Sequence, residues 1–380
     1  FRSMTVRAKS EEVLAIAKDV LKSKRYRIRE LPDSVGAEKG FIREAGNLLF
    51  HLSLILLLIG VAYGSLGGMK ADVIINEGET FTNVATSYDS LRAGSLFSID
   101  DIPPFSITAK KFTAKYDLVT SAPLDYQLDA LVTDSPDGSP REVKIRVNSP
   151  LTFGDTRVYL QANGYSPIVT VRNRSGEIVL RGPVPFLPQD GNLTSTGAIK
   201  VPDMDPQLGF VAKFLPTAER TAERGGFSTF PEPLKPLLDL AAWSGDLGLD
   251  SGIPQSVYRI DTRKLTEIGL AALSPGQRWD LPNGIGSITF EGFVSWVNLQ
   301  VVRDPGKEYS LLGAILILLG LLVSLFGRRH RIWVRVRGSE RDTIVEIAGL
   351  TRSPGLDHEI ASLVRVIENN SGKGADGINE

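Results

Sequence analysis

The chain has 380 residues, of which 42% are hydrophobic and 23% charged, with a formal net charge of −1 and no cysteine. The absence of cysteine excludes a disulfide framework and any thiol step carried by this chain itself. The sequence starts at Phe1 without a methionine or a signal-peptide pattern, so we expect further membrane spans upstream of it.

Residues 1–45 are predicted to form a small cytoplasmic α+β segment. Residues 4–8 favour a short strand, and residues 13–21 repeat apolar side chains at helical spacing. The predicted helix therefore has one apolar face, which must cover another part of the protein.

Two apolar segments, residues 46–66 and 310–327, are long enough to cross a membrane as helices. By the positive-inside rule both chain ends are predicted to be cytoplasmic, and residues 67–309 extracytoplasmic. Because the basic residues gather at the membrane edges, nucleic-acid binding has no support. The basic groups that flank the spans are Arg25, Arg27, Arg29, Lys39 and Arg43 before the first, and Arg328, Arg329, His330, Arg331, Arg335 and Arg337 after the second.

Residues 67–309 contain many short alternating runs separated by Gly, Pro, Asn and Asp, a pattern typical of antiparallel β structure. Only residues 234–243 favour a helix in this region. The segment is thus predicted to be a mainly β domain, built as a sandwich or barrel.

Residues 328–368 favour two strands followed by a helix, and the polar residues 369–380 are predicted to be a disordered tail. Since neither terminal segment is large enough to bury its apolar face alone, we expect the two to fold together. The predicted fold class is a membrane protein with two transmembrane helices, which flank a large extracytoplasmic mainly β domain. A small cytoplasmic α+β piece is contributed by both chain ends.

His51 lies just inside the first apolar segment and is the most informative residue of the chain. One interpretation is a neutral imidazole that donates to a carbonyl one turn back, such as that of Asn47, or that lies at the headgroup level. The other is an axial ligand of haem iron, which a neutral imidazole supplies well. Because no second His, Cys or Met stands near it in the spans, a partner protein would have to provide the other axial ligand.

Small residues recur at four-residue spacing on both spans: Gly60, Gly64 and Gly68 on the first, and Gly320 and Ser324 on the second. This pattern lets another helix approach closely. Packing within the chain and packing against a partner are equally compatible with it.

The other polar residues give weaker signals. His330 is interpreted as an interfacial basic group, and His358 as a surface residue. The sequence has no GxSxG, HExxH or phosphate-binding loop, so nothing indicates a hydrolase or an NTPase.

Several longer segments are distinctive together. They are residues 40–52 (GFIREAGNLLFHL), 148–151 (NSPL) with 158–167 (VYLQANGYSP), 182–191 (GPVPFLPQDG), 296–306 (WVNLQVVRDPG) and 324–329 (SLFGRR). In wording, order and spacing they resemble the ResB family of cytochrome c biogenesis proteins, and the resemblance covers nearly the whole chain. Residues 182–191 are similar to the actinobacterial branch of that family.

The resemblance implies a subunit of the system II cytochrome c maturation machinery in a bacterial plasma membrane, and not an enzyme by itself. A CcsA/ResC-type membrane partner would move haem b outward together with this chain, for covalent attachment to apocytochrome c. Thioredoxin-like thiol reductants are further implied partners. The resemblance also implies that His51, which matches the family's haem-ligating histidine, is one axial ligand of a membrane haem. The haem would be transported rather than permanently held. The alternative is a membrane-tethered β-domain scaffold or sensor without haem.

Overall fold

The computed structural model describes residues 1–249, 252, 256–327, 329–338, 342–351 and 355–371. The chain forms two compact units, one built from Phe1–Ala62 with Gly306–Glu380 and the other from Tyr63–Pro305. We call the first the terminal unit and the second the central domain.

Both chain ends contribute to one sheet in the terminal unit. Its strands are β1 (Arg2–Val6), β2 (Arg27–Leu31), β3 (Ser34–Lys39), β22 (His330–Gly338) and β23 (Thr343–Thr351). They pair antiparallel in the order β1-β23-β22-β3-β2. Each chain end therefore depends on the other for its hydrogen-bonded neighbours.

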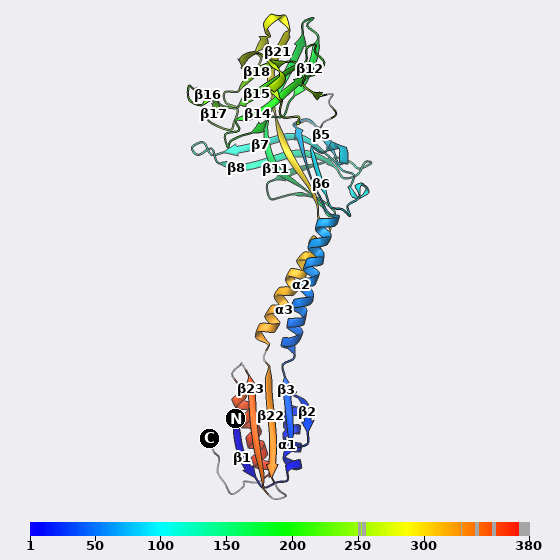
Figure 1. Cartoon of the computed structure of the whole chain (residues 1–380), viewed down its shortest axis with the longest axis vertical. Helices are drawn as coiled ribbons and strands as arrows, with labels where there is room; N and C mark the ends of the chain where they lie inside the picture. The colour runs from blue at the N-terminus through cyan, green and yellow to red at the C-terminus, as the bar shows by residue number, and fades with distance from the viewer. Residues whose placement is uncertain (250–251, 253–255, 328, 339–341, 352–354, 372–380) are drawn as a thin grey trace. The chain divides into compact units, whose positions relative to one another are not determined.

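Two helices, α1 (Ser10–Ser23) and α4 (Leu356–Ser371), cover one face of this sheet (Figure 1). Each presents an apolar stripe at helical spacing, with Val13 and Leu21 buried on α1 and Ile360 and Ile367 buried on α4. These side chains share one core with the buried face of the strands.

The tail expected from residue 369 is a wrong prediction over its first three residues, because α4 continues to Ser371. The amide of Asn370 donates to the carbonyl of Val366 at 2.8 Å, and Ser371 is buried. Residues 372–380, the rest of the expected tail, lie outside the described residues.

Two long apolar helices, α2 (Ile42–Gly67) and α3 (Lys307–Phe326), have the length and composition of membrane spans. In the most apolar 18-residue stretch of each helix, only 17% is buried in α2 and 11% in α3. A core helix of a soluble domain would be mostly covered, so these exposed apolar surfaces mark a membrane protein. α2 begins four residues before the expected span, which places Arg43 and Glu44 in its first turn.

The two helices pack antiparallel, and their backbones approach closely at glycine positions. A Cβ on Gly46 would lie 2.6 Å from the backbone nitrogen of Ser324, and one on Gly320 would lie 2.7 Å from that of Phe50. Further along the pair, a Cβ on Gly60 would lie 2.6 Å from the nitrogen of Ser310. Glycine is therefore what allows the two backbones to approach this closely.

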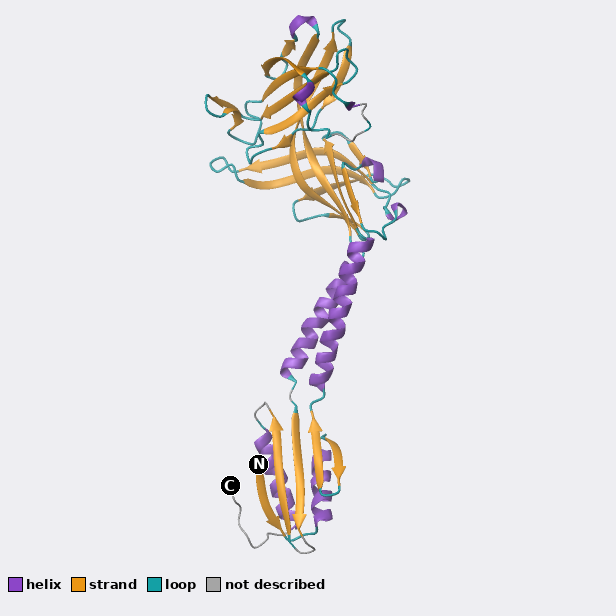
Figure 2. Cartoon of the chain, in the orientation of Figure 1, coloured by secondary structure: helices purple, strands orange, loops and turns teal. Residues whose placement is uncertain are grey.

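The central domain is built of strands, loops and single helical turns, which confirms the mainly β prediction (Figure 2). Two strands of 18 residues each, β11 (Thr156–Asn173) and β21 (Gly286–Arg303), pair over their whole length. Bulges interrupt their register at Leu160/Ala162 and Ile168/Val169, where such irregularities bend a strand. The two strands consequently contribute to two separate cores.

One core lies between two sheets, of which the first contains part of β11 and β21 with β4, β6 and β10, and the second is β5-β7-β8-β9. The strands concerned are β4 (Met69–Asn76), β5 (Thr80–Thr82), β6 (Ser90–Ala93), β7 (Ser106–Tyr116), β8 (Pro123–Thr133), β9 (Arg141–Arg146) and β10 (Leu151–Phe153).

The other core also lies between two sheets. The first contains the remaining part of β11 and β21 with β12 and β20, and the second is β13-β14-β15-β18-β19. Strands β16 and β17 form a separate two-stranded ribbon. The strands concerned are β12 (Ile178–Pro183), β13 (Leu187–Pro188), β14 (Ser195–Val201), β15 (Leu208–Leu215), β16 (Ala218–Thr221), β17 (Gly225–Ser228), β18 (Leu237–Ser244), β19 (Thr266–Leu273) and β20 (Arg278–Asp280).

The helix expected over residues 234–243 is wrong, because most of this segment is strand β18. Leu238, Leu240 and Ala242 are buried and alternate with less buried neighbours, which is the two-residue period of a strand. The segment pairs with β15 on one side and β19 on the other. A short apolar run of Leu and Ala does not by itself distinguish a helix from a buried strand.

The helix contact can be tested by substituting Gly320→Ile. The added side chain would meet the backbone of Phe50, so we expect the helices to separate and the pair to lose about 1–3 kcal/mol of packing free energy. Because the chain has no cysteine, spin labels on Leu48→Cys and Leu322→Cys, both exposed, can report the distance by electron paramagnetic resonance.

The matched control is Leu319→Ile, which keeps the side-chain volume at an exposed neighbouring position. We expect a longer and broader distance distribution for Gly320→Ile and an unchanged one for the control. The same distribution in both variants would contradict the glycine-mediated contact.

Candidate functional site

His51 lies on α2 with its side chain exposed on the surface of the helix pair. Its Nδ1 is 2.8 Å from the carbonyl oxygen of Asn47, one turn earlier, and its ring packs edge-on against Phe50 with ring centroids 5.2 Å apart. A carbonyl oxygen can only accept, so Nδ1 carries the proton of this bond. In the neutral imidazole, Nε2 then keeps its lone pair and can accept a hydrogen bond or bind a metal.

The hydrogen bond to Asn47 is the contact that the first interpretation of His51 predicts, and it is compatible with the second. The hydrogen bond to Asn47 uses one ring nitrogen, and a metal needs only the other. A ligating histidine usually donates its second nitrogen to a carbonyl or carboxylate in this way, which fixes the tautomer and the ring orientation. The residues of this chain therefore fit a single axial ligand for an iron centre.

The other histidines lie outside the two membrane helices, on β22 and α4. His330 is buried, and its Nδ1 is 3.8 Å from the carboxylate of Glu359. Lys39 Nζ is 2.5 Å from that carboxylate, and the hydroxyl of Tyr26 also donates to it. Burial alone would raise the pKa of Glu359, but these donors outweigh it and lower the pKa. His358 is exposed, as expected.

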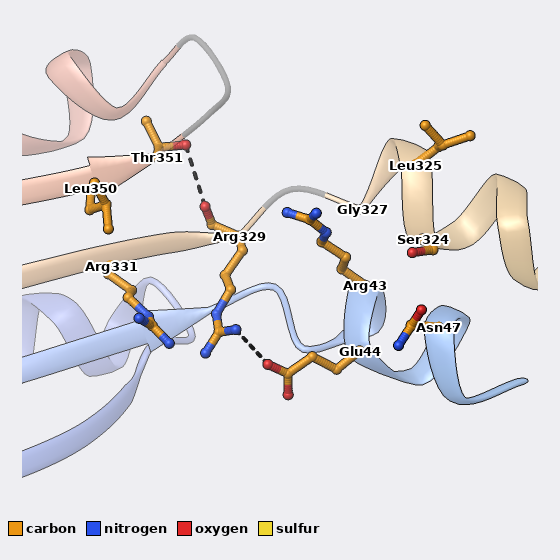
Figure 3. A pocket seen from close by; sticks show the side chains of 10 residues that line it. All are labelled: Arg43, Glu44, Asn47, Ser324, Leu325, Gly327, Arg329, Arg331, Leu350 and Thr351. Carbon is orange, nitrogen blue, oxygen red and sulfur yellow. Dashed lines mark hydrogen bonds and ion pairs between the residues drawn. The ribbon is translucent and has the colours of Figure 1, made fainter. Parts of the chain in front are cut away.

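A cavity of about 900 Å³ opens beside the first turn of α2, and it is lined by residues of α2, α3, β22 and β23 and of the link between α3 and β22 (Figure 3). Asn47 and Ser324 face each other across one side of it, and Arg43, Arg329 and Arg331 also line it, with the guanidinium groups of Arg329 and Arg331 near each other and that of Arg43 apart from them. The cavity and His51 are close along the helix, since Asn47 lines the cavity and accepts the hydrogen bond of His51.

Two carboxylates hold two of these guanidinium groups. Arg329 bridges Glu38 and Glu44, with 2.5 Å from its Nη1 to the Glu44 carboxylate, and the Nε of Arg331 lies 2.6 Å from the Glu38 carboxylate. Burial alone would raise the pKa of Glu38, but hydrogen bonds and charge from Arg331 and Arg329 outweigh it and lower the pKa. Among the described residues, no carboxylate lies within ion-pair distance of Arg43. Arg328 lies outside the described residues.

The model of the ResB-like family matches residues 1–360 of this chain. The chain belongs to the ResB-like family.

Curated relatives of this ResB-like chain are cyanobacterial proteins named cytochrome c biogenesis protein CcsB. The protein of Thermosynechococcus vestitus is 28% identical over 270 residues, which are 66% of this chain and 57% of the relative. That of Synechococcus elongatus is 26% identical over 307 residues, or 80% of this chain and 56% of the relative. The chain thus spans a little over half of the length of these relatives.

The segments that resemble the ResB family meet in the fold of this ResB-like chain. Residues 158–167 lie on β11 and pair with residues 293–301 of β21, so Gly164 stands opposite Trp296. The Trp296 indole packs onto Gly164, where a Cβ would lie 2.5 Å from the ring, and its Nε1 donates to the carbonyl of Phe186 at 3.0 Å. These contacts hold β11, β21 and the segment around Phe186 together in the central domain.

The small residues singled out in the sequence are distributed over several places. Gly60 lies against Ser310, Gly320 against Phe50, and the backbone of Ser324 against Gly46. Gly64 lies on α2 and is partly exposed. Gly68 follows the end of α2, where a Cβ would lie 2.8 Å from the carbonyl oxygen of Arg303.

The contact face of the helices has a seven-residue repeat that the sequence reasoning missed. On α2 the buried residues of this face are Gly46, Ser53 and Gly60, and on α3 they include Gly313 and Gly320. A seven-residue period is the spacing of left-handed helix pairs, so it could have identified Gly46 and Gly313.

The arginine-bound carboxylate of Glu38 makes a testable contribution to stability. Its folded-state pKa is below the ordinary 4.5, so the stabilisation is present above that value and lost as pH falls through the folded-state pKa. Glu38→Gln should therefore weaken β3 and β22 near neutral pH, by up to about 1 kcal/mol for such partly exposed pairs. Amide hydrogen exchange of these strands in the full chain measures the effect.

At a pH below the lowered folded-state pKa of Glu38, the exchange of Glu38→Gln should match that of the wild type, because both side chains are then neutral. The control is Glu12→Gln on the exposed side of α1, which should leave exchange in both strands unchanged at either pH. A loss of protection in Glu38→Gln that is equally large at low pH would contradict the ion-pair account.

Proposed function

We propose that this chain is a subunit of a system II cytochrome c maturation complex, which moves haem across a bacterial plasma membrane and supports its attachment to apocytochrome c. Membership of the ResB-like family and the names of the curated relatives support this function. The observation that carries it is the geometry of His51, whose Nε2 is left free on the surface of an apolar helix. The chain supplies binding and orientation within the complex and is not an enzyme by itself.

In this proposal haem is a transported substrate, and His51 supplies one axial ligand to its iron. The hydrogen bond to Asn47 fixes the imidazole orientation, so that Nε2 is presented away from the helix axis. A histidine of a CcsA/ResC-type partner supplies the second ligand, because the other two histidines of this chain lie on β22 and α4 rather than in the spans. Two imidazoles hold haem iron in a low-spin state and leave no open coordination position.

The proposed orientation follows from charge. Basic residues flank both membrane helices at the ends that connect to the terminal unit. They include Arg43 in the first turn of α2 and Arg331 on β22, which follows α3. By the positive-inside rule the terminal unit is cytoplasmic and the central domain extracytoplasmic. His51 then lies near the cytoplasmic end of its span, where haem enters the membrane.

The central domain would present apocytochrome c at the outer face of the membrane. Haem attachment needs reduced thiols on apocytochrome c, and this chain has no cysteine with which to supply electrons. Thioredoxin-like reductants are therefore proposed as further partners of the complex.

Replacing His51 tests the proposal. We expect His51→Ala, purified with the CcsA-type partner, to lose most of its haem and its low-spin absorption spectrum while expression stays intact. Added imidazole should fill the vacated space and restore part of the spectrum. The measurement is the visible absorption spectrum with haem quantified per complex.

His358→Ala is the matched control, because His358 is an exposed histidine on α4. It should retain the wild-type spectrum. Undiminished low-spin haem in His51→Ala would reject His51 as a ligand and favour the scaffold interpretation of this chain.

A further inference from the structure

The cavity beside the first turn of α2 has an excess of positive charge. Three arginines line it, and two of them, Arg329 and Arg331, are paired with the carboxylates of Glu38 and Glu44. Arg43 is the remaining cation, with no carboxylate within ion-pair distance among the described residues. The cavity of about 900 Å³ has room for a sizeable anionic group.

Arg43 is not placed for the stability of its own helix. It stands in the first turn of α2, where the helix dipole is positive and disfavours a cation. The favourable first-turn charge is that of Glu44, which is already paired with Arg329. An anion in the cavity would be attracted both by the Arg43 guanidinium and by the positive end of the helix.

The cavity and His51 lie on one continuous path along α2. Asn47 lines the cavity, and His51 is four residues further on, so the two side chains lie on the same face one turn apart, about 6 Å along the axis. Arg43 is one turn before Asn47. A flat amphiphile that placed a metal at His51 would direct its nearest polar edge toward the guanidinium groups.

We propose that this cavity is a carboxylate site in which Arg43 binds a propionate of haem while the iron approaches His51. The inference rests on the proposed function and adds the residue that recognises the charged edge of the substrate. A guanidinium matches a carboxylate with two parallel hydrogen bonds, and Arg keeps its charge in partly desolvated surroundings. Arg329 and Arg331, already bound to carboxylates, keep the cavity walls in place.

A phosphate of an anionic lipid has the same chemistry as a propionate toward a guanidinium group. The position of the cavity at the end of two membrane helices makes such a headgroup the other source of an anion. The experiment must therefore separate a carboxylate on the porphyrin from a phosphate on a lipid.

The experiment titrates two probes into the full chain with its CcsA-type partner in phosphatidylcholine nanodiscs. The probes are ferric haem and haem dimethyl ester, which keeps the iron but has no carboxylate charge. Because a hydrogen bond between charged groups contributes about 1.5–3 kcal/mol, the wild type should bind haem at least about tenfold more tightly than the ester. Arg43→Gln should weaken haem binding by about the same factor and leave the ester unchanged.

Two further variants keep the outcome interpretable. Arg43→Lys retains the charge without the two parallel hydrogen bonds, so its preference for haem over the ester should be intermediate. Arg7→Gln removes an exposed cation that does not line the cavity and should behave as the wild type. If Arg43→Gln does not fold, the lysine variant alone decides whether the preference depends on Arg43.

His51→Ala separates this inference from the proposed function. It should weaken both probes alike and abolish the low-spin spectrum, while the preference for haem over the ester persists. Absence of a low-spin spectrum in the wild type would reject His51 as ligand, and the affinity ratio would still report on Arg43. An unchanged haem-to-ester ratio in Arg43→Gln would overturn the carboxylate site.

A second series in nanodiscs that contain phosphatidylglycerol tests the lipid. If a headgroup is the ligand, Arg43→Gln will lower the amount of phosphatidylglycerol retained by the purified complex and leave the haem-to-ester ratio as in the wild type. That pair of results would also overturn the proposal.

Discussion

The glycine-lined contact between α2 and α3 determines where the functional residues of the terminal unit lie. Because Gly46 and Gly320 allow the backbones to touch, β3 before α2 and β22 after α3 emerge side by side and pair through Lys39 and His330. The same contact occupies one face of α2 and leaves His51 on an exposed face. In a membrane, where a helix gains little from apolar burial against another helix, such close backbone packing is a main source of association.

The hydrogen bond between His51 and Asn47 connects this packing to function. A free imidazole on an apolar helix would carry an unsatisfied donor, and the carbonyl one turn back removes that cost while fixing the ring. His51 thus supplies one oriented ligand for haem iron, and a partner protein must supply the second axial ligand. The arginines beside the same helix end add a charged contact for a substrate that has an apolar body and an anionic edge.

Sequence reasoning predicted the features that local patterns encode and failed where distant segments decide. The two spans and the mainly β domain follow from apolar length and from two-residue alternation. By contrast, the Leu and Ala residues of β18 fit both the helical and the strand period. Only pairing with β15 and β19, which are distant in sequence or separated by loops, makes this segment a strand. The cavity could not be predicted, because Glu44 and Arg329, which meet in its wall, are 285 residues apart in the chain. The contact face of the helices was encoded locally, but at a seven-residue rather than a four-residue spacing.

The most direct test of the account is to detect the bond between this chain and the iron. The chain would be produced with ¹⁵N-labelled histidine, combined with the unlabelled CcsA-type partner and ferric haem, and studied by electron–nuclear double resonance. The account predicts one ¹⁵N coupling of axial-ligand strength, which is lost in His51→Ala and kept in His358→Ala. A low-spin haem without any ¹⁵N coupling would show that both ligands come from the partner and would contradict the role of His51.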